Sequence, residues 1–377
     1  MKIYNRITLA ATAAACLLVV PWPDPAPARI QGSCSDCHTM HNSQDDDVMT
    51  FDEPAPRENL LRGDCLGCHA MDIGTPTYDL TTDKIPQVHH TGGIDLAAGN
   101  FRHITTSGNQ NRGHNIIDLN GAETTLLYPP GLTAVSQHTN FWNNHIVSCV
   151  SREDTAGCHG LRQRINTLPE GITGAHHNNT DGQLDQATVT GNSYRFLLGV
   201  KGYEDPDWEL TTGPGDHNEY YGRTTPIQLG CGGAGSGNTN CHSSGGALVP
   251  PDGTMSQFCA SCHGNFHTLA NGDDVGIGPD AVSPFLRHPT DLALPTDGEY
   301  AAYISYNPEA PVARTAGVPG GPSSSVTPGT DAVMCLSCHR AHASEYPDML
   351  RWDSTTIIAG QGTGNNDGCF VCHTTKN

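Results

Sequence analysis

Cys34-Ser35-Asp36-Cys37-His38 is a Cys-x-x-Cys-His pentapeptide, and this chain of 377 residues repeats the pattern four more times. The other copies are Cys65–His69, Cys259–His263, Cys335–His339 and Cys369–His373. The pattern is typical of the attachment site of a c-type haem, where two thiols bind the porphyrin and the adjoining histidine binds the iron. Five copies in one chain predict a multihaem protein.

Two stretched versions of the pattern raise the expected number of haems from five to seven. Eight and nine residues separate their cysteines, and the residues concerned are Cys149, Cys158 and His159, and Cys231, Cys241 and His242. Only the second cysteine must adjoin the histidine, so extra residues can loop outward, as the Gly-rich run 232–240 would allow. The alternative is a pair of disulfides in an oxidising compartment.

We number the seven haem motifs in chain order. Their proximal histidines, the predicted iron ligands, are His38, His69, His159, His242, His263, His339 and His373. Their cysteines are Cys34 and Cys37, Cys65 and Cys68, Cys149 and Cys158, Cys231 and Cys241, Cys259 and Cys262, Cys335 and Cys338, and Cys369 and Cys372. The spacing predicts haem pairs in 32–70, 231–263 and 335–373, and an isolated haem near 149–159.

The N-terminus predicts export. Residues 1–28 read as a signal peptide, with a basic start, an apolar stretch from about Ile7 to Val20 and a cleavage site at Ala26-Pro27-Ala28. The region 29–377 is then the heptahaem part, in the periplasm, on the outer surface or outside the cell. The fifteenth cysteine, Cys16, falls in the leader, and we predict no transmembrane segment after it.

Composition predicts that haem forms the core. Hydrophobic residues make up 36% of the chain, with 43 Gly and 26 Pro, which is little for an ordinary core of this size. We therefore expect a mostly irregular, loop-rich fold with short α-helices beside the haem motifs and little β structure. The covalently bound haem chain would hold these loops together.

Thirteen of the twenty histidines lie outside the motifs, which is enough to give every iron a second ligand. A haem with two histidine ligands passes electrons, whereas an open iron can bind a substrate. The distal ligands predicted are His41, His114, His177, His217, His267, His288 and His342. His41 and His342 follow a proximal histidine by three residues and share its helix face, so each should reach a neighbouring haem. Of each doublet, His89/His90 and His176/His177, we expect one ligand, while His103, His138 and His145 are assigned ordinary polar roles or propionate contacts.

The chain also resembles a known family in Cys34–Gln44, Cys335–Ser344, Gly368–His373, Asp216–Tyr220 and Arg287–Asp291. These stretches are similar to the doubled-CxxCH multihaem cytochromes of metal-respiring anaerobic bacteria. The resemblance implies electron transfer through bis-histidine haems toward extracellular acceptors such as iron oxides, and some relatives polymerise into filaments. Motifs 3 and 4 depart from the family's spacing.

We therefore expect an exported electron carrier and not an enzyme, with other cytochromes or extracellular metal oxides as partners. A net charge of −20 disfavours nucleic acid. One alternative is a multihaem reductase of nitrogen or sulfur oxyanions with one open haem, although no Cys-x-x-Cys-Lys occurs. Another is a polymer whose subunits donate a histidine to the next subunit's terminal haem.

Overall fold

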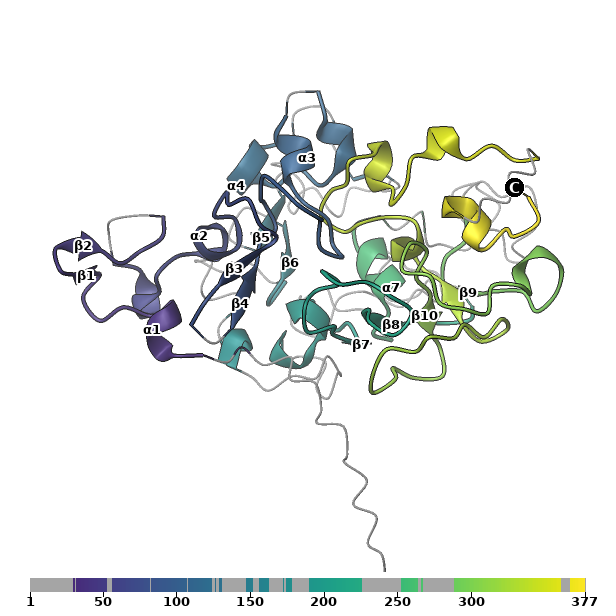
Figure 1. The fold of residues 1–377 in the computed structure, drawn as a ribbon, viewed down its shortest axis with the longest axis horizontal. Coiled ribbons are helices and arrows are strands. Elements are labelled where there is room, and N and C mark those ends of the chain that lie inside the picture. The colour runs from purple at the N-terminus through teal and green to yellow at the C-terminus, as the bar shows by residue number, and fades with distance from the viewer. Residues whose placement is uncertain are drawn as a thin grey trace, which may run out of the picture.

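The structure is a computed structural model, and it is loop-rich. It describes residues 30, 32–52, 56–81, 83–106, 108–123, 126, 129–130, 147–151, 156–162, 172, 174–177, 190–225, 252–263, 266, 288–360 and 367–376. Short helical turns and two- to four-residue strands are joined by long irregular segments (Figure 1). The predicted fold class is confirmed.

Short helices or 3-10 turns lie at motifs 1, 2, 5, 6 and 7, as predicted, whereas the cysteines of motif 3 lie on strands. The α-helices described are α1 Cys34–Cys37, α2 Cys65–His69, α3 Arg102–Thr105, α4 Ile117–Asn120 and α7 Met255–Ala260. The 3-10 turns are η1 Glu58–Leu60, η2 Gln110–Arg112, η3 Ala175–His177, η4 Thr190–Asn192, η5 Tyr194–Phe196, η7 Gly298–Tyr300, η8 Cys335–Ser337, η9 Pro347–Met349, η10 Ser354–Thr356 and η11 Gly368–Val371. Local capping starts α2 and α7, since Asp64 accepts from the Gly67 N–H at 2.8 Å and Thr254 from that of Gln257 at 3.1 Å.

Strands form one mixed sheet and three two-stranded ribbons. The sheet has the order β7-β8-β10-β11-β9, with Gly202–Tyr203, Glu219–Tyr221, Ala313–Arg314, Ala332–Val333 and Leu292–Ala293. Only β8 and β10 pair in parallel among these. The ribbons are β1 Ser43–Gln44 with β2 Asp47–Val48, β3 Thr77–Asp79 with β4 Lys84–Pro86, and β5 Val147–Val150 with β6 Ala156–His159.

The hydrophobic residues gather in three small clusters, and each one touches cysteines of the haem motifs. Phe101 and Ile104 pack with Cys149 beside them, and Tyr194 and Tyr220 belong to a cluster that contacts Cys158 and Cys259. The third cluster, which includes Trp352, contacts Cys338 and Cys372. Apolar packing is therefore concentrated where porphyrin would attach, as expected of a core completed by haem.

A buried charge network ties the mixed sheet together. Arg314 on β10 donates to Glu219 on β8 at 2.6 and 3.2 Å, and to Asp331 at 2.5 Å. His217 lies 3.1 Å from the Glu219 carboxylate. Burial by itself would raise the pKa of Glu219, but the hydrogen bonds from His217 and Arg314 lower it. Glu219 therefore stays ionised and holds the two strands in register.

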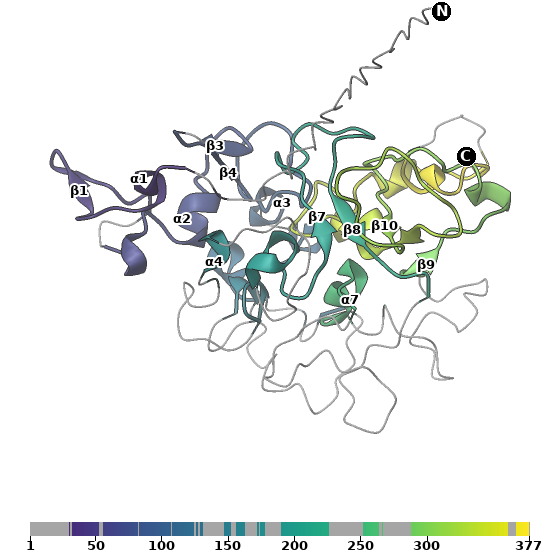
Figure 2. The same ribbon diagram turned by 90° about the horizontal axis from the view of Figure 1, so that it is seen from below.

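The molecule is elongated, and the chain progresses along its long axis. The N-terminal turns α1, β1 and β2 project at one end, and the C-terminus lies at the other (Figure 1). The view from below gives the same order, with α7 and β9 between α2 and the C-terminus (Figure 2). None of the helices in the described ranges has the length and apolar character needed to cross a membrane.

Candidate haem-binding sites

Motif 3 shows how a stretched motif can bring its cysteines together. β5 and β6 pair in parallel, with Ser148 opposite Gly157 and Val150 opposite His159, so Cys149 and Cys158 face each other across the ladder. Both are half-buried free thiols, not a disulfide. A side chain at position 157 would collide with the backbone of Val150 and Ser151, so glycine lets the returning strand approach. Motif 4 lies outside the described residues.

Five proximal histidines share one second contact. The Nδ1–H of His38, His69, His159, His263 and His339 donates to the backbone carbonyl of Asn59, Pro86, Arg195, Pro130 and Asp348, at 2.7–2.9 Å. This contact places the proton on Nδ1 and leaves Nε2 with a bare lone pair, the form in which imidazole binds a metal.

Five proximal histidines also have a second imidazole opposite them. The ring centres are 6.1 Å apart for His38 and His177, 6.4 Å for His69 and His176, 6.2 Å for His159 and His342, 6.1 Å for His263 and His114, and 6.3 Å for His373 and His288. The interplanar angles range from 15° to 87°, so a shared separation, and not ring stacking, is what these pairs have in common.

That separation fits one iron atom between each pair of rings. An imidazole nitrogen binds a metal at about 2 Å, and its ring centre lies about 1 Å further away, so two imidazoles on opposite sides of an iron have centres about 6 Å apart. A direct stacking contact would be much closer, as it is for His217 and Tyr306 at 3.6 Å. The residues present therefore fit a six-coordinate haem.

Burial favours the neutral form of several of these imidazoles. It lowers the pKa of His176 and His263 to about 4, and that of His342 to about 3. It also lowers the pKa of His69, His114 and His159. Neutral rings near pH 7 have the lone pair that coordination requires.

Both members of one doublet face a proximal histidine, although the sequence suggested one. His176 and His177 are consecutive residues of η3, and they oppose the proximal histidines of motifs 2 and 1. Consecutive residues of a 3-10 turn point about 120° apart, so one turn can serve two irons. The sequence does contain a usable signal for His176, because two motifs with short spacing are followed further along by a histidine doublet.

His217, one of the predicted distal ligands, lies in a buried polar network. It is fully buried, its Nδ1 donates to the Gly213 carbonyl at 3.0 Å, and its Nε2 contacts Glu219. Its ring stacks on Tyr306. Since both nitrogens face acceptors, neither is available to an iron in this structure.

The remaining histidines fall into several groups. His41 is exposed on the surface, and His267 lies outside the described residues. Within the described ranges, no histidine ring stands opposite His339 at a separation like those above.

Three further histidines make polar contacts. His103 contacts Asp95 at 2.7 Å, His89 lies 3.7 Å from Asp72, and His90 donates to the Gly92 carbonyl at 2.5 Å. His138 and His145 lie outside the described residues.

The described motifs follow one another in a line. Burial raises the pKa of Cys68 to about 12, and Cys37 contributes to the rise because motif 1 lies beside motif 2. Further along, Cys65 and Cys149 line one small pocket, and Cys158 and Cys259 pack against one cluster. Cys335 hydrogen-bonds with Cys259 and raises its pKa, and Cys338 and Cys372 pack against another cluster. The order is therefore 1, 2, 3, 5, 6, 7, along the long axis (Figure 1).

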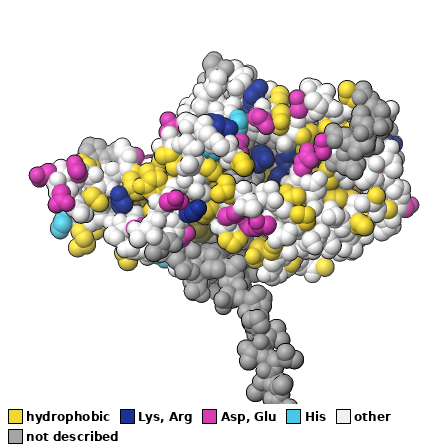
Figure 3. All heavy atoms as spheres, in the orientation of Figure 1, with side chains coloured by type: hydrophobic (Ala, Val, Ile, Leu, Met, Phe, Trp, Pro, Cys, Tyr) yellow, Lys and Arg dark blue, Asp and Glu magenta, His cyan; other side chains and the backbone are white. Residues whose placement is uncertain are grey.

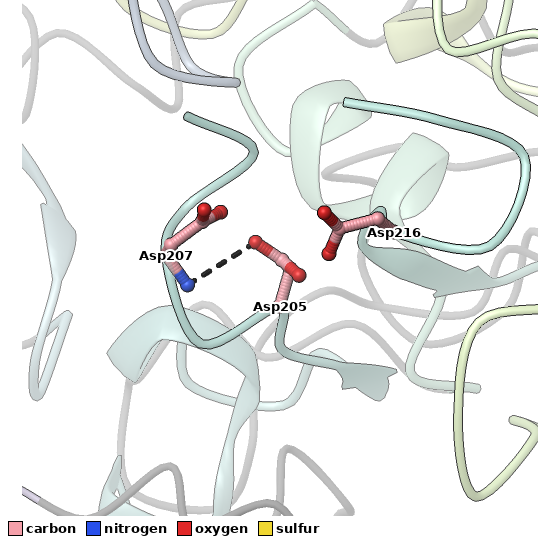
Figure 4. A group of neighbouring side chains, drawn as sticks. All are labelled: Asp205, Asp207 and Asp216. Atoms are coloured by element: carbon pink, nitrogen blue, oxygen red, sulfur yellow. Dashed lines mark hydrogen bonds between the residues drawn. The ribbon is translucent and has the colours of Figure 1, made fainter. Parts of the chain in front are cut away.

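One acidic group lies apart from these motifs. Asp205, Asp207 and Asp216 bring carboxylate oxygens within 4.8 Å of one another (Figure 4). Asp205 is buried and accepts from the N–H groups of Asp207 and Glu209 at 3.2 and 2.8 Å. Burial and the neighbouring Asp207 raise its pKa to about 7.

Comparison with known proteins agrees with these motifs. Residues 327–377, which contain motifs 6 and 7, match the Doubled CXXCH motif family. C-type cytochrome OmcS of Geobacter sulfurreducens is 28% identical over 413 residues, which cover 96% of this chain and 89% of the relative. Two solved structures are similar at lower identity. The outer membrane cytochrome S filament from Geobacter sulfurreducens has 20% identity and a TM-score of 0.38, covering 87% of this chain and 86% of that one. The OmcS nanowires have 18% identity and a TM-score of 0.41, covering 87% and 85%.

The five regular haem motifs, the opposed imidazoles and the two sequence matches define one class. This chain is a multihaem c-type cytochrome, and its general role is electron transfer.

Proposed function

We propose that this protein is an exported electron carrier in which seven c-type haems, each held between two histidines, form one path through the chain. The five opposed imidazole pairs are the observation that supports this most directly. An iron with both axial positions filled has no place for a substrate, so it exchanges electrons without making or breaking bonds.

Each axial pair joins segments that are distant in sequence. In this proposal His177, His176, His342, His114 and His288 are the distal ligands of motifs 1, 2, 3, 5 and 7. The fourteen cysteines of the seven motifs hold the haems as thioethers. The line of cysteine contacts supports an electron path in the order 1, 2, 3, 5, 6, 7, with motif 4 joining it at a position that the described residues do not include.

Export and partners follow from the leader and the charge. Removal of residues 1–28 releases the chain into the periplasm or beyond, and similarity to OmcS supports the outer surface or the extracellular space. The acidic surface favours cationic redox partners and metal-oxide surfaces as acceptors, by an attraction that salt weakens.

The spin state of the iron tests this function. We expect the oxidised holoprotein to give low-spin signals only by EPR, because every iron has two imidazole ligands. Intact mass should equal residues 29–377 plus seven haems. A large high-spin fraction would instead indicate an open iron and a reductase. A mass with five haems would indicate that both stretched motifs form disulfides.

A second candidate function is that of a filament subunit, and His41 favours it. His41 is exposed on the projecting N-terminal end, three residues after His38, and Met40 beside it is 76% exposed. Acidic side chains gather at this end (Figure 3). We propose that His41 supplies the axial position of a haem in the next subunit, for which His339 is the candidate partner. OmcS, to which this chain is similar, is described as forming nanowires.

Removing the His41 imidazole tests assembly separately from electron transfer. We expect His41→Ala to abolish filaments in negative-stain microscopy and to convert one haem to the high-spin state, since a donated ligand is lost. Ser43→Ala, an exposed change on β1, should leave filaments intact. Wild-type protein that remains monomeric at all concentrations would contradict this second function and leave the first one standing.

A further inference from the structure

Motif 7 differs from the other described motifs in what its proximal histidine faces. Nδ1 of His373 lies 3.3 Å from Oε1 of Glu299, a carboxylate, whereas the other five described proximal histidines donate to neutral backbone carbonyls. On the opposite side, the distal His288 has the ordinary contact, with Nδ1 3.0 Å from the Pro289 carbonyl. The difference is therefore confined to one ligand of one haem.

The surroundings hold Glu299 in this position. It lies in η7, and its backbone carbonyl accepts a hydrogen bond from the hydroxyl of Thr374, the residue after His373. The ring of Tyr300 packs edge-on against His373 with centres 5.2 Å apart. The Glu299 side chain is 15% exposed, and its Oε2 is buried with no hydrogen-bond partner among the described residues. Its charge acts on two described groups, since it also adds to burial in raising the pKa of Tyr300, to which the Glu299 side chain is hydrogen-bonded, and only His373 of the two belongs to a haem motif.

A carboxylate at this point favours the oxidised iron. A charged acceptor withdraws the Nδ1 proton more strongly than a carbonyl does, which makes the imidazole a more basic ligand. The negative charge would also act on an iron bound by His373 in a site of low exposure, where electrostatic interactions are strong. Both effects stabilise the more positive state of the iron, and so both lower its reduction potential.

We propose that Glu299 is a positioning residue that lowers the reduction potential of the haem held by Cys369 and Cys372. The inference rests on the proposed function, in which His373 and His288 bind that iron. An electron that arrives at the C-terminal end is then favoured to move inward, toward motif 6 and the haems whose histidines face carbonyls.

Glu299→Gln in the full-length holoprotein tests the inference, because glutamine keeps the shape and an oxygen acceptor but removes the charge. In spectroelectrochemical titration we expect the potential of one haem to rise, with an about tenfold change in its reduced-to-oxidised ratio, about 59 mV for a one-electron couple. The EPR signal of one low-spin haem should move as well. The shifted component is identified as the one missing from a Cys369→Ala/Cys372→Ala protein.

Glu309→Gln is the matched control. The Glu309 carboxylate accepts a hydrogen bond from the Gly368 N–H at 3.0 Å, next to Cys369. The substitution therefore removes an equal charge near the same haem without changing a contact of His373. An equal shift in both variants, or no shift in Glu299→Gln, would overturn the proposal. A wild-type protein whose motif 7 haem is high-spin would show separately that the axial pair His373 and His288 is wrong.

Discussion

The double variant Cys149→Ala/Cys158→Ala is expected to carry one haem fewer than the wild-type protein. Motif 3 brings the two thiols together across the β5–β6 ladder and sets His159 directly after the second one, as a thioether-bound haem requires. Thioether bonds survive unfolding, so the intact mass of the denatured protein should fall by one haem. Because motif 3 lies between motifs 2 and 5, reduction of the remaining haems from one end should also become slower.

The outcome separates two readings of the stretched motifs. Cys259→Ala/Cys262→Ala, in a regular motif, is the matched control and should lose one haem by the same measurement. If the pair Cys149 and Cys158 forms a disulfide instead, the variant will keep the haem count of the wild type and lose only a reducible bond. That result would contradict the assignment of seven haems.

His342→Ala is expected to convert one of the haems from low spin to high spin. The His342 ring stands 6.2 Å from that of His159, and no other described imidazole opposes His159 at such a separation. Loss of the ring leaves that iron with one histidine and an open position. EPR of the oxidised protein should show one high-spin iron, and carbon monoxide should bind the reduced form at that iron.

His217→Ala is the matched control, since it removes a buried imidazole whose two nitrogens already face acceptors. We expect it to leave the spin state unchanged but to destabilise the holoprotein by about 3–5 kcal/mol, because the buried ionic network around Glu219 loses a member. The unfolding midpoint in denaturant measures this loss. A high-spin iron in His217→Ala and none in His342→Ala would reverse the two assignments.

The sequence predicted the loop-rich fold because covalent attachment leaves a local pattern. Each regular motif is a single turn of helix, and its cysteines and histidine are adjacent in the chain. The low hydrophobic content likewise predicted that the chain lacks an ordinary core, and the described residues form three small clusters. These are properties of short segments, so one sequence is enough to identify them.

The distal ligands were harder to predict because they come from far along the chain. His114 and His342 reach their partners through loops whose paths no local pattern encodes. His217 was predicted from its Asp-His-Asn context, yet its Nε2 lies 3.1 Å from the carboxylate of Glu219, the first residue of β8. The Glu219 carboxylate therefore occupies the Nε2 side of the His217 ring. His41 and His342 occupy equivalent positions after a proximal histidine, and only His342 has an imidazole opposite it among the described residues.

The turn Ala175–His177 has a mechanical consequence. Two consecutive residues, with Cα atoms about 3.8 Å apart, would bind two different metal centres and so fix the distance between them. A pulling force along the molecule would extend the irregular loops before it could separate these two centres. The separation of the first two centres should therefore stay constant under tension, even where the surrounding chain yields.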